Sequence, residues 1–182
     1  MRQQVEGGSG TLLDILKYCI LAKMNTFEDL IGKLKSLPLL VKATMDGTIN
    51  NNADNIADMN RAQMLVLGVD ADGIELGEYA AFTIKQRQER GLQTDYIDLR
   101  FTGDFQNSIG LNKIGDTFEL GASDVKWEDS ISGLNLSERW PAAIGLTDDN
   151  EDRITAVIEH NTDLEVDKYL DVSTNSDVPA FA

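Results

Sequence analysis

"YIDLRFTGDFQNSIGL", residues 96–111, is the stretch on which the expected fold depends. Its first part alternates apolar and polar side chains, with the apolar ones at Ile97, Leu99 and Phe101. This period of two predicts a β-strand that turns one face towards a core. Thr102–Gly103 then interrupts the pattern, because glycine permits a sharp bend and threonine can cap a helix. The stretch therefore predicts a strand, a corner and a short helix capped by Thr102.

The residues after the corner predict a small sheet with helices packed on it. Phe105 and Ile109 are four positions apart, so they share one face of a short helix that begins near Asp104. Two apolar runs follow on either side of Gly115–Asp116, a turn pair suited to a β-hairpin. We expect an α+β fold: a small antiparallel sheet with a hairpin, covered by helices and preceded by an N-terminal helical region.

Helical periodicity is typical of most of the remaining chain. Pro38 suits the first position of a long helix that Gly68 ends, and Gly47 with residues 50–52 favours a break in its middle. Thr147 is expected to cap the last helix, whose inward stripe contains Ile154. The other expected helices are an amphipathic one from Thr11 to about Ala22, one with the stripe Phe27, Leu30, Ile31 and Leu34, one over 78–90, and two short ones after Ser123 and around 137–140.

Three parts are expected along the chain. Residues 1–37 hold an N-terminal arm and amphipathic helices, residues 38–170 form the α+β domain, and residues 171–182 form a C-terminal tail. The tail is rich in Ser, Asn and Asp, so it is expected to be disordered or to become ordered only against a neighbour.

The charge balance limits the classes of function. The chain has 31 Asp and Glu against 16 Lys and Arg, a net charge of −15. Because phosphate neutralisation supplies most of the affinity for nucleic acid, direct binding of DNA or RNA is disfavoured. The basic residues do not cluster, and Lys85, Arg87 and Arg90 are expected to form one solvated helix face. The apolar run over residues 12–22 is too short and too charged to span a bilayer, which predicts no membrane association.

No set of residues supports catalysis or a bound cofactor. His160 is the only histidine and is expected on the surface near a helix C-terminus, while Cys19 lies in an apolar stripe that favours a buried, inert thiol. "DADG" at 70–73 begins like a calcium loop, but Ala81 stands where that loop needs glutamate. The carboxylates at 147–152 point in different directions on a helix. The sequence predicts no catalytic residue, no metal and no cofactor, and hence no enzyme.

Two segments together resemble a known family. Thr102, Gly103, Phe105, Ser108 and Ile109 match a Thr-Gly motif that is a hallmark of the tail-completion or virion morphogenesis proteins of tailed bacteriophages. In that family a hairpin follows, and then a Pro-Ala segment leads to Gly-Leu-Thr and an acidic helix. This chain has "WPAAIGLTDDNEDRI" at 140–154, in which the matching residues are Pro141, Gly145 and Leu146. Residues 60–87 are also similar to prophage relatives of the Bacteroides-group type.

The resemblance implies a non-enzymatic protein of the virion at the head–tail junction. Such a protein is made in the bacterial host cytoplasm and forms a sixfold or twelvefold ring that joins the portal or its adaptor to the tail. DNA would pass through the lumen without specific binding, and we expect the acidic first turn of the last helix or Glu128–Asp129 to face that channel. The candidate subunit contacts lie in the terminal segments, at Leu12, Ile15, Leu16, Ile20, Pro179 and Phe181.

Two other classes of protein stay open at this point. An acidic inhibitor that mimics DNA would place its carboxylates in rows spaced like phosphates and bind a basic enzyme. A metal-dependent hydrolase would need converging ligands that the spacing does not supply.

Overall fold

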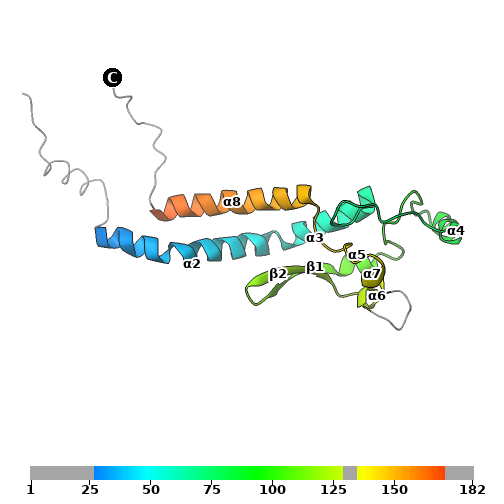
Figure 1. Cartoon of the computed structure of the whole chain (residues 1–182), viewed down its shortest axis with the longest axis horizontal. Coiled ribbons are helices and arrows are strands. Elements are labelled where there is room, and N and C mark those ends of the chain that lie inside the picture. The colour runs from blue at the N-terminus through cyan, green and yellow to red at the C-terminus, as the bar shows by residue number, and fades with distance from the viewer. Residues whose placement is uncertain (1–26, 129–134, 171–182) are drawn as a thin grey trace, which may run out of the picture. The chain divides into compact units, whose positions relative to one another are not determined.

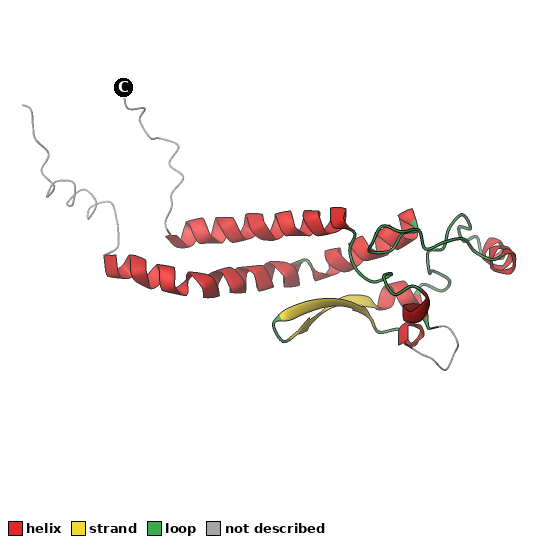
Figure 2. Cartoon of the chain, in the orientation of Figure 1, coloured by secondary structure: helices red, strands yellow, loops and turns green. Residues whose placement is uncertain are grey.

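The sequence folds into helices and one hairpin in the computed structural model, which describes residues 27–128 and 135–170. Over these residues the fold is α+β, as predicted, with seven α-helices, one π-helical segment and a two-stranded antiparallel sheet (Figure 2). The elements in chain order are α2 (Phe27–Asn51), α3 (Ala53–Ala62), η1 (Gln63–Leu67), α4 (Ala81–Glu89), α5 (Asp104–Ser108), β1 (Ile109–Ile114), β2 (Thr117–Ala122), α6 (Val125–Glu128), α7 (Leu136–Arg139) and α8 (Asp148–Leu170).

The chain divides into two units, which we describe separately. Unit 1 comprises residues 1–43 and 164–182, and unit 2 comprises Thr44–Asp163. Within unit 1, the hydroxyl groups of Ser36 and Tyr169 are 2.7 Å apart, and the Lys33 ammonium lies 5.7 Å from the centre of the Tyr169 ring. These contacts join α2 to the end of α8.

Helix α2 continues through Pro38, so the predicted helix start at this residue is wrong. Proline has no N–H, and Pro38 therefore leaves the carbonyl of Leu34, four residues earlier, without its helical donor. Both residues are exposed, and water can reach that carbonyl. The missing hydrogen bond thus does not end the helix, and the two helices expected over 26–67 are joined across Pro38.

The long helical region breaks at Asn52, where the sequence predicts a weak point. Helix α2 ends at Asn51 and α3 begins at Ala53, while the Asn52 side chain donates to the Thr48 carbonyl at 2.9 Å. The predicted end at Gly68 is also confirmed, because this residue is the left-handed C-cap of η1. Its φ is +67°, and a Cβ there would lie 2.4 Å from the Tyr96 ring, so only glycine fits.

The corner and the hairpin follow the prediction, except that Ile109, which was expected on one helix face with Phe105, is the first residue of β1. Helix α5 begins at Asp104, directly after Gly103, and leads into β1. The two strands pair from Ile109 opposite Ala122 to Ile114 opposite Thr117, which places Gly115–Asp116 in a two-residue turn. Helices α5, α6 and α7 lie at the end of the hairpin opposite this turn (Figure 1).

The predicted strand over residues 97–101 is wrong, because this segment forms an irregular loop. Its alternating pattern does not separate a buried face from an exposed one. Asp98 is 3% exposed, whereas Phe101 is 41% exposed. Leu99 has a φ of +54°, which a strand does not permit.

The core of unit 2 joins residues that lie far apart in the sequence. Helix α3 packs against β1, and α5 contacts β2. Ile154 of α8 is also buried, at 8% exposure, and α8 begins after Thr147 as predicted. The central cluster consists of Ala57, Met64, Leu76, Ile97, Phe105, Ile109 and Ala143.

None of the described helices combines the length and the apolar content that a bilayer crossing requires.

Candidate functional site

The Thr-Gly motif forms a structural corner. Gly103, with a φ of +96°, is the N-cap of α5, so the cap lies one residue after the predicted Thr102. The Thr102 hydroxyl donates to the Asp104 carboxylate at 2.6 Å and accepts from the Asp104 N–H at 3.5 Å. Ser108 donates its hydroxyl to the Phe105 carbonyl at 2.8 Å. Apart from the Asp104 carboxylate, which also lies 3.8 Å from Lys126 Nζ, these polar groups bond within the corner itself, which is a structural arrangement.

The second motif is held by polar side chains of α3 and η1. Asn60, which is fully buried, donates from Nδ2 to the carbonyls of Ala143 and Gly145, at 3.0 and 2.7 Å. Gln63 donates to the same Gly145 carbonyl at 2.9 Å and accepts from the Thr147 N–H at 3.2 Å. A Cβ on Gly145 would lie 2.7 Å from the Ala71 Cβ, so this position needs glycine. Within the same motif, Pro141 is exposed and Leu146 is half-buried.

The two motifs meet in one core. Phe105 and Ile109 of the first motif belong to the same buried cluster as Ala143 of the second. Arg61 of α3 supports the corner by donating to the carbonyls of Gln106 at 2.8 Å and Ile109 at 2.6 Å. Two segments about 40 residues apart in the sequence therefore form a single packed unit.

A buried ion pair between Arg87 and Asp98 organises the loop before this corner. Arg87 Nη2 lies 2.7 Å from Asp98 Oδ2, and the two side chains are 1% and 4% exposed. Arg87 also donates to the Gln93 carbonyl at 2.6 Å and to the Arg100 carbonyl. The expected solvated face is therefore wrong for Arg87, because three acceptors of the loop and the Tyr79 ring surround the guanidinium. Its planar shape allows several such hydrogen bonds at once.

Tyr79 completes this buried network. Its hydroxyl donates to Asp98 Oδ1 at 2.8 Å and accepts from the Asp98 N–H at 3.1 Å, and the Arg87 guanidinium lies 4.2 Å from its ring centre. Burial raises the pKa of Tyr79 to about 12, and the negative charge of Asp98 adds to the increase. The phenol therefore stays protonated and serves as a hydrogen-bond donor.

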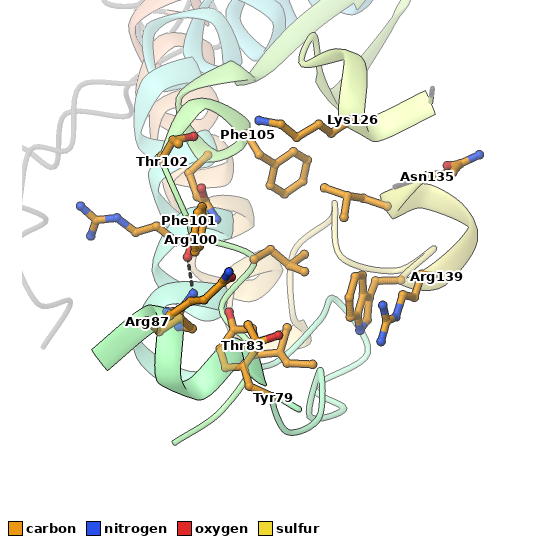
Figure 3. Close-up of a pocket in the computed structure, with 17 residues that line it drawn as sticks. Tyr79, Thr83, Arg87, Arg100, Phe101, Thr102, Phe105, Lys126, Asn135 and Arg139 are labelled. Carbon is orange, nitrogen blue, oxygen red and sulfur yellow. Dashed lines mark hydrogen bonds between the residues drawn. The ribbon is translucent and has the colours of Figure 1, made fainter. Parts of the chain in front are cut away.

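A cavity of about 470 Å³ opens beside this network. This volume lies in the range of ligand pockets, roughly 300–1,000 Å³. Tyr79, Thr83 and Arg87 lie on one side and Lys126 and Asn135 on the other (Figure 3). Its apolar and aromatic lining consists of Tyr79, Ile97, Leu99, Phe101, Phe105, Leu136 and Trp140.

The charged residues that line the cavity are all cationic. They are Arg87, Arg100, Lys126 and Arg139, and no carboxylate lines it among the described residues. Arg87 is neutralised by Asp98, and Lys126 lies 3.4 Å from Asp124. Within the described ranges, Arg100 and Arg139 form no ion pair, although Arg139 stacks on Trp140 with 4.5 Å to the ring centre. In a chain of net charge −15, the cavity thus combines cationic side chains with an apolar lining.

The cavity could not be found by reading the sequence. Its walls come from α4, the loop over 97–103, α5, α6 and α7, and no motif connects these segments. The only hint of the cavity in the sequence was the group of basic residues in and just after α4, which the sequence pattern predicted to face solvent. Arg87 faces inward instead.

The other positions named from the sequence lack a convergent geometry. Asp70 accepts from the N–H groups of Asp72 and Ile74, at 3.0 and 2.9 Å, as in a turn. His160 is exposed in the middle of α8, which continues to Leu170, so the expected position near a helix C-terminus is wrong. In the described ranges no group of three metal-binding side chains occurs. Cys19, Asp129 and the candidate contacts Leu12, Ile15, Leu16, Ile20, Pro179 and Phe181 lie outside the described residues.

An apolar stripe on α2 is exposed within the described chain. Its members are spaced as on one helix face, and Phe27 and Leu34 are 73% and 50% exposed. Leu30 and Ile31, at 43% and 37%, complete it. A contiguous exposed apolar face of this kind marks a surface for association.

No family model, curated protein or solved structure matches this chain.

Proposed function

We propose that the chain is a virion structural protein of the head–tail junction of a tailed bacteriophage. Copies of it form a ring that joins the portal or its adaptor to the tail and lets DNA pass. The observation that carries the proposal is the common core of the two motifs, with Phe105 and Ile109 packed beside Ala143. Residues of a catalytic motif would instead converge on a cavity with their polar atoms.

The apolar stripe of α2 supports assembly. Packing this helix face against another subunit would stabilise the assembly, because each apolar side chain that becomes buried contributes about 1.5–3 kcal/mol to the free energy of association. The exposed side chains of the face are Phe27, Leu30, Ile31 and Leu34. A ring needs two different complementary surfaces on each subunit, and this stripe is a candidate for one of them.

The acidic residues of α8 are consistent with a channel wall that does not bind DNA. The carboxylates of Asp148, Asp149, Glu151 and Asp152 in the first turns of α8 are exposed. Repeated around a ring, such charges repel phosphates and reduce friction with a passing duplex. Their place at a helix N-terminus also stabilises α8, so the same residues can serve both purposes.

The proposal can be tested through the oligomeric state of the purified chain. Wild-type protein at micromolar concentration is expected to give rings in negative-stain images and one oligomeric mass by mass photometry. Leu34→Glu places a charge in the stripe and should abolish the rings. Lys35→Glu is the matched control, because it introduces the same side chain at the next, exposed position, and should leave them intact.

Thermal unfolding of both variants separates assembly from folding. Neither side chain belongs to the buried core, so the monomer should lose less than about 0.5 kcal/mol in either case. A wild-type chain that stays monomeric at every concentration contradicts ring formation. A stoichiometric complex with a basic DNA-binding enzyme would favour the DNA-mimic class instead.

A further inference from the structure

We propose that the cavity of unit 2 binds the C-terminal segment, residues 171–182, of a second copy of this chain. The inference rests on the proposed function, because it assigns one of the contacts between neighbouring subunits of the ring. The occupant is an acidic and apolar peptide.

The cavity has the chemistry to hold such a peptide. Phe101, Phe105 and Trp140 supply aromatic surface, and the Phe105 ring stacks on Trp127 at 5.7 Å between centres, which fixes its position. Aromatic walls of this kind bind proline and other apolar side chains of extended peptides. Arg100 and Arg139 are exposed cations without a carboxylate partner in the described ranges. The cavity therefore favours an anion beside an apolar group.

The C-terminal sequence has the complementary composition. Residues 171–182, "DVSTNSDVPAFA", contain two aspartates and no lysine or arginine. Asp177 directly precedes the apolar group Val178, Pro179 and Phe181. The carboxylate of this peptide complements the cations at the cavity, and its proline and aromatic ring complement the aromatic lining. Proline also limits the conformations of the free peptide, which lowers the entropic cost of binding.

We assign the peptide to a second copy because the proposed ring requires contacts between subunits. The segment continues from Leu170, the last residue of α8. When extended, the segment can reach about 40 Å. Each subunit would give one segment and receive one, and such a heterologous exchange closes into a ring when the rotation permits.

A first experiment measures binding with a labelled synthetic peptide of residues 171–182. The partner is the full chain with Phe181→Ala, so that its own segment competes less, and the readout is fluorescence anisotropy. We expect saturable binding that is at least tenfold weaker for a Phe181→Ala peptide and unchanged for a Ser176→Ala peptide. Arg139→Glu in the protein should also weaken binding at least tenfold, while Arg153→Glu, an exposed arginine on α8, should not.

The absence of saturable binding overturns the proposal. The proposal is also overturned if neither Phe181→Ala in the peptide nor Arg139→Glu in the protein weakens binding, because the cavity would then not be the binding site. Raising the salt concentration should weaken the interaction several-fold, since the cations are exposed.

A second experiment identifies which copy supplies the segment. Two full-length variants in a Cys19→Ser background are mixed under oxidising conditions, one with Ala182→Cys beside Phe181 and one with Thr83→Cys in the cavity wall. A third variant carries both cysteines in one chain. A disulfide between two chains is expected, and Gln88→Cys, exposed on the same helix α4 but outside the cavity, should give none. If only the variant with both cysteines in one chain reacts, and reacts within the monomer, the second copy is excluded.

The two proposals fail in different ways. Rings that form without the peptide contact and without the crosslink would leave the proposed function intact and overturn this inference. A crosslinked dimer from a chain that never forms rings would support the peptide site and contradict the ring.

Discussion

Replacing Arg87 by methionine tests whether the ion pair with Asp98 organises unit 2. The variant keeps an aliphatic side chain of similar length but loses the hydrogen bonds to Asp98 and to the carbonyls of Gln93 and Arg100. Asp98 then stays 4% exposed with its charge uncompensated. The neighbouring donors, which are the Tyr79 hydroxyl, the Gln93 amide and the Arg100 N–H, cannot replace a cation.

The expected loss is about 3–5 kcal/mol of unfolding free energy, the usual effect of removing one partner of a buried ion pair. A domain of this size has roughly 5–15 kcal/mol in total, so the loss is a large fraction. With a urea dependence near 2 kcal/mol per molar, the unfolding midpoint should fall by about 2 M.

Urea unfolding followed by circular dichroism at pH 7 measures this change. Lys85→Met is the matched control, because Lys85 is exposed on the same helix α4 and should change the stability by less than about 0.5 kcal/mol. Asp98→Asn and the double variant complete a thermodynamic cycle. The double variant should lose less than the sum of the single losses, by about 0.5–3 kcal/mol, since it removes both charges.

Two results would refute this reasoning. If Arg87→Met is no more destabilising than Lys85→Met, the guanidinium does not stabilise the folded conformation of the loop. If the losses in the cycle are additive, the two side chains act independently despite their 2.7 Å separation.

Two further predictions concern Tyr79 and Gly145. The pKa of Tyr79 is raised to about 12 from an ordinary value of 10.0, so the folded state holds this proton more tightly and stability should fall as the pH rises from about 10 to 12. Tyr79→Phe should make the urea midpoint less dependent on pH in that window, and an unchanged dependence would contradict the assignment. Gly145→Ala should cost about 1–3 kcal/mol in thermal unfolding, because its Cβ would lie 2.7 Å from Ala71 and its φ is +149°. Gly110→Ala, where nothing lies within 4 Å of the added Cβ, is the control, and equal losses would mean that the close approach at Gly145 is tolerated.

Features set by neighbouring residues could be predicted from the sequence. Gly115–Asp116 connects strands whose register is fixed by the two-residue turn, and Gly68 ends η1 in a left-handed conformation that glycine favours. The bend before α5 likewise lies at a glycine, Gly103, in a left-handed conformation. Such elements need no knowledge of the rest of the fold.

Features that depend on distant partners could not be predicted. Asp98 alternates with Ile97 and Leu99 as in an amphipathic strand, yet it is buried because Arg87 neutralises it. The sequence pattern had grouped Arg87 with Lys85 and Arg90 as surface cations, although its guanidinium is buried. The cavity has the same origin, since its walls come from α4, the loop over 97–103, α5, α6 and α7, which are separate segments of the sequence.

The loop between α4 and α5 is held without a strand ladder, and this affects how it opens. Its amides are engaged singly: Ile97 donates to the Gly77 carbonyl at 2.8 Å, Asp98 to the Tyr79 hydroxyl at 3.1 Å, and Arg100 to the Asp98 carboxylate at 2.8 Å. The last two of these depend on the position of Asp98, whereas the Leu92 amide bonds to the Arg87 carbonyl and the Asp95 and Tyr96 amides bond to Gln93 Oε1. A local fluctuation that separates the ion pair is therefore expected to release the part of the loop around residues 98–100, while the part before it keeps its own hydrogen bonds. The cavity would then loosen at this edge, while the walls supplied by α5, α6 and α7 stay in place.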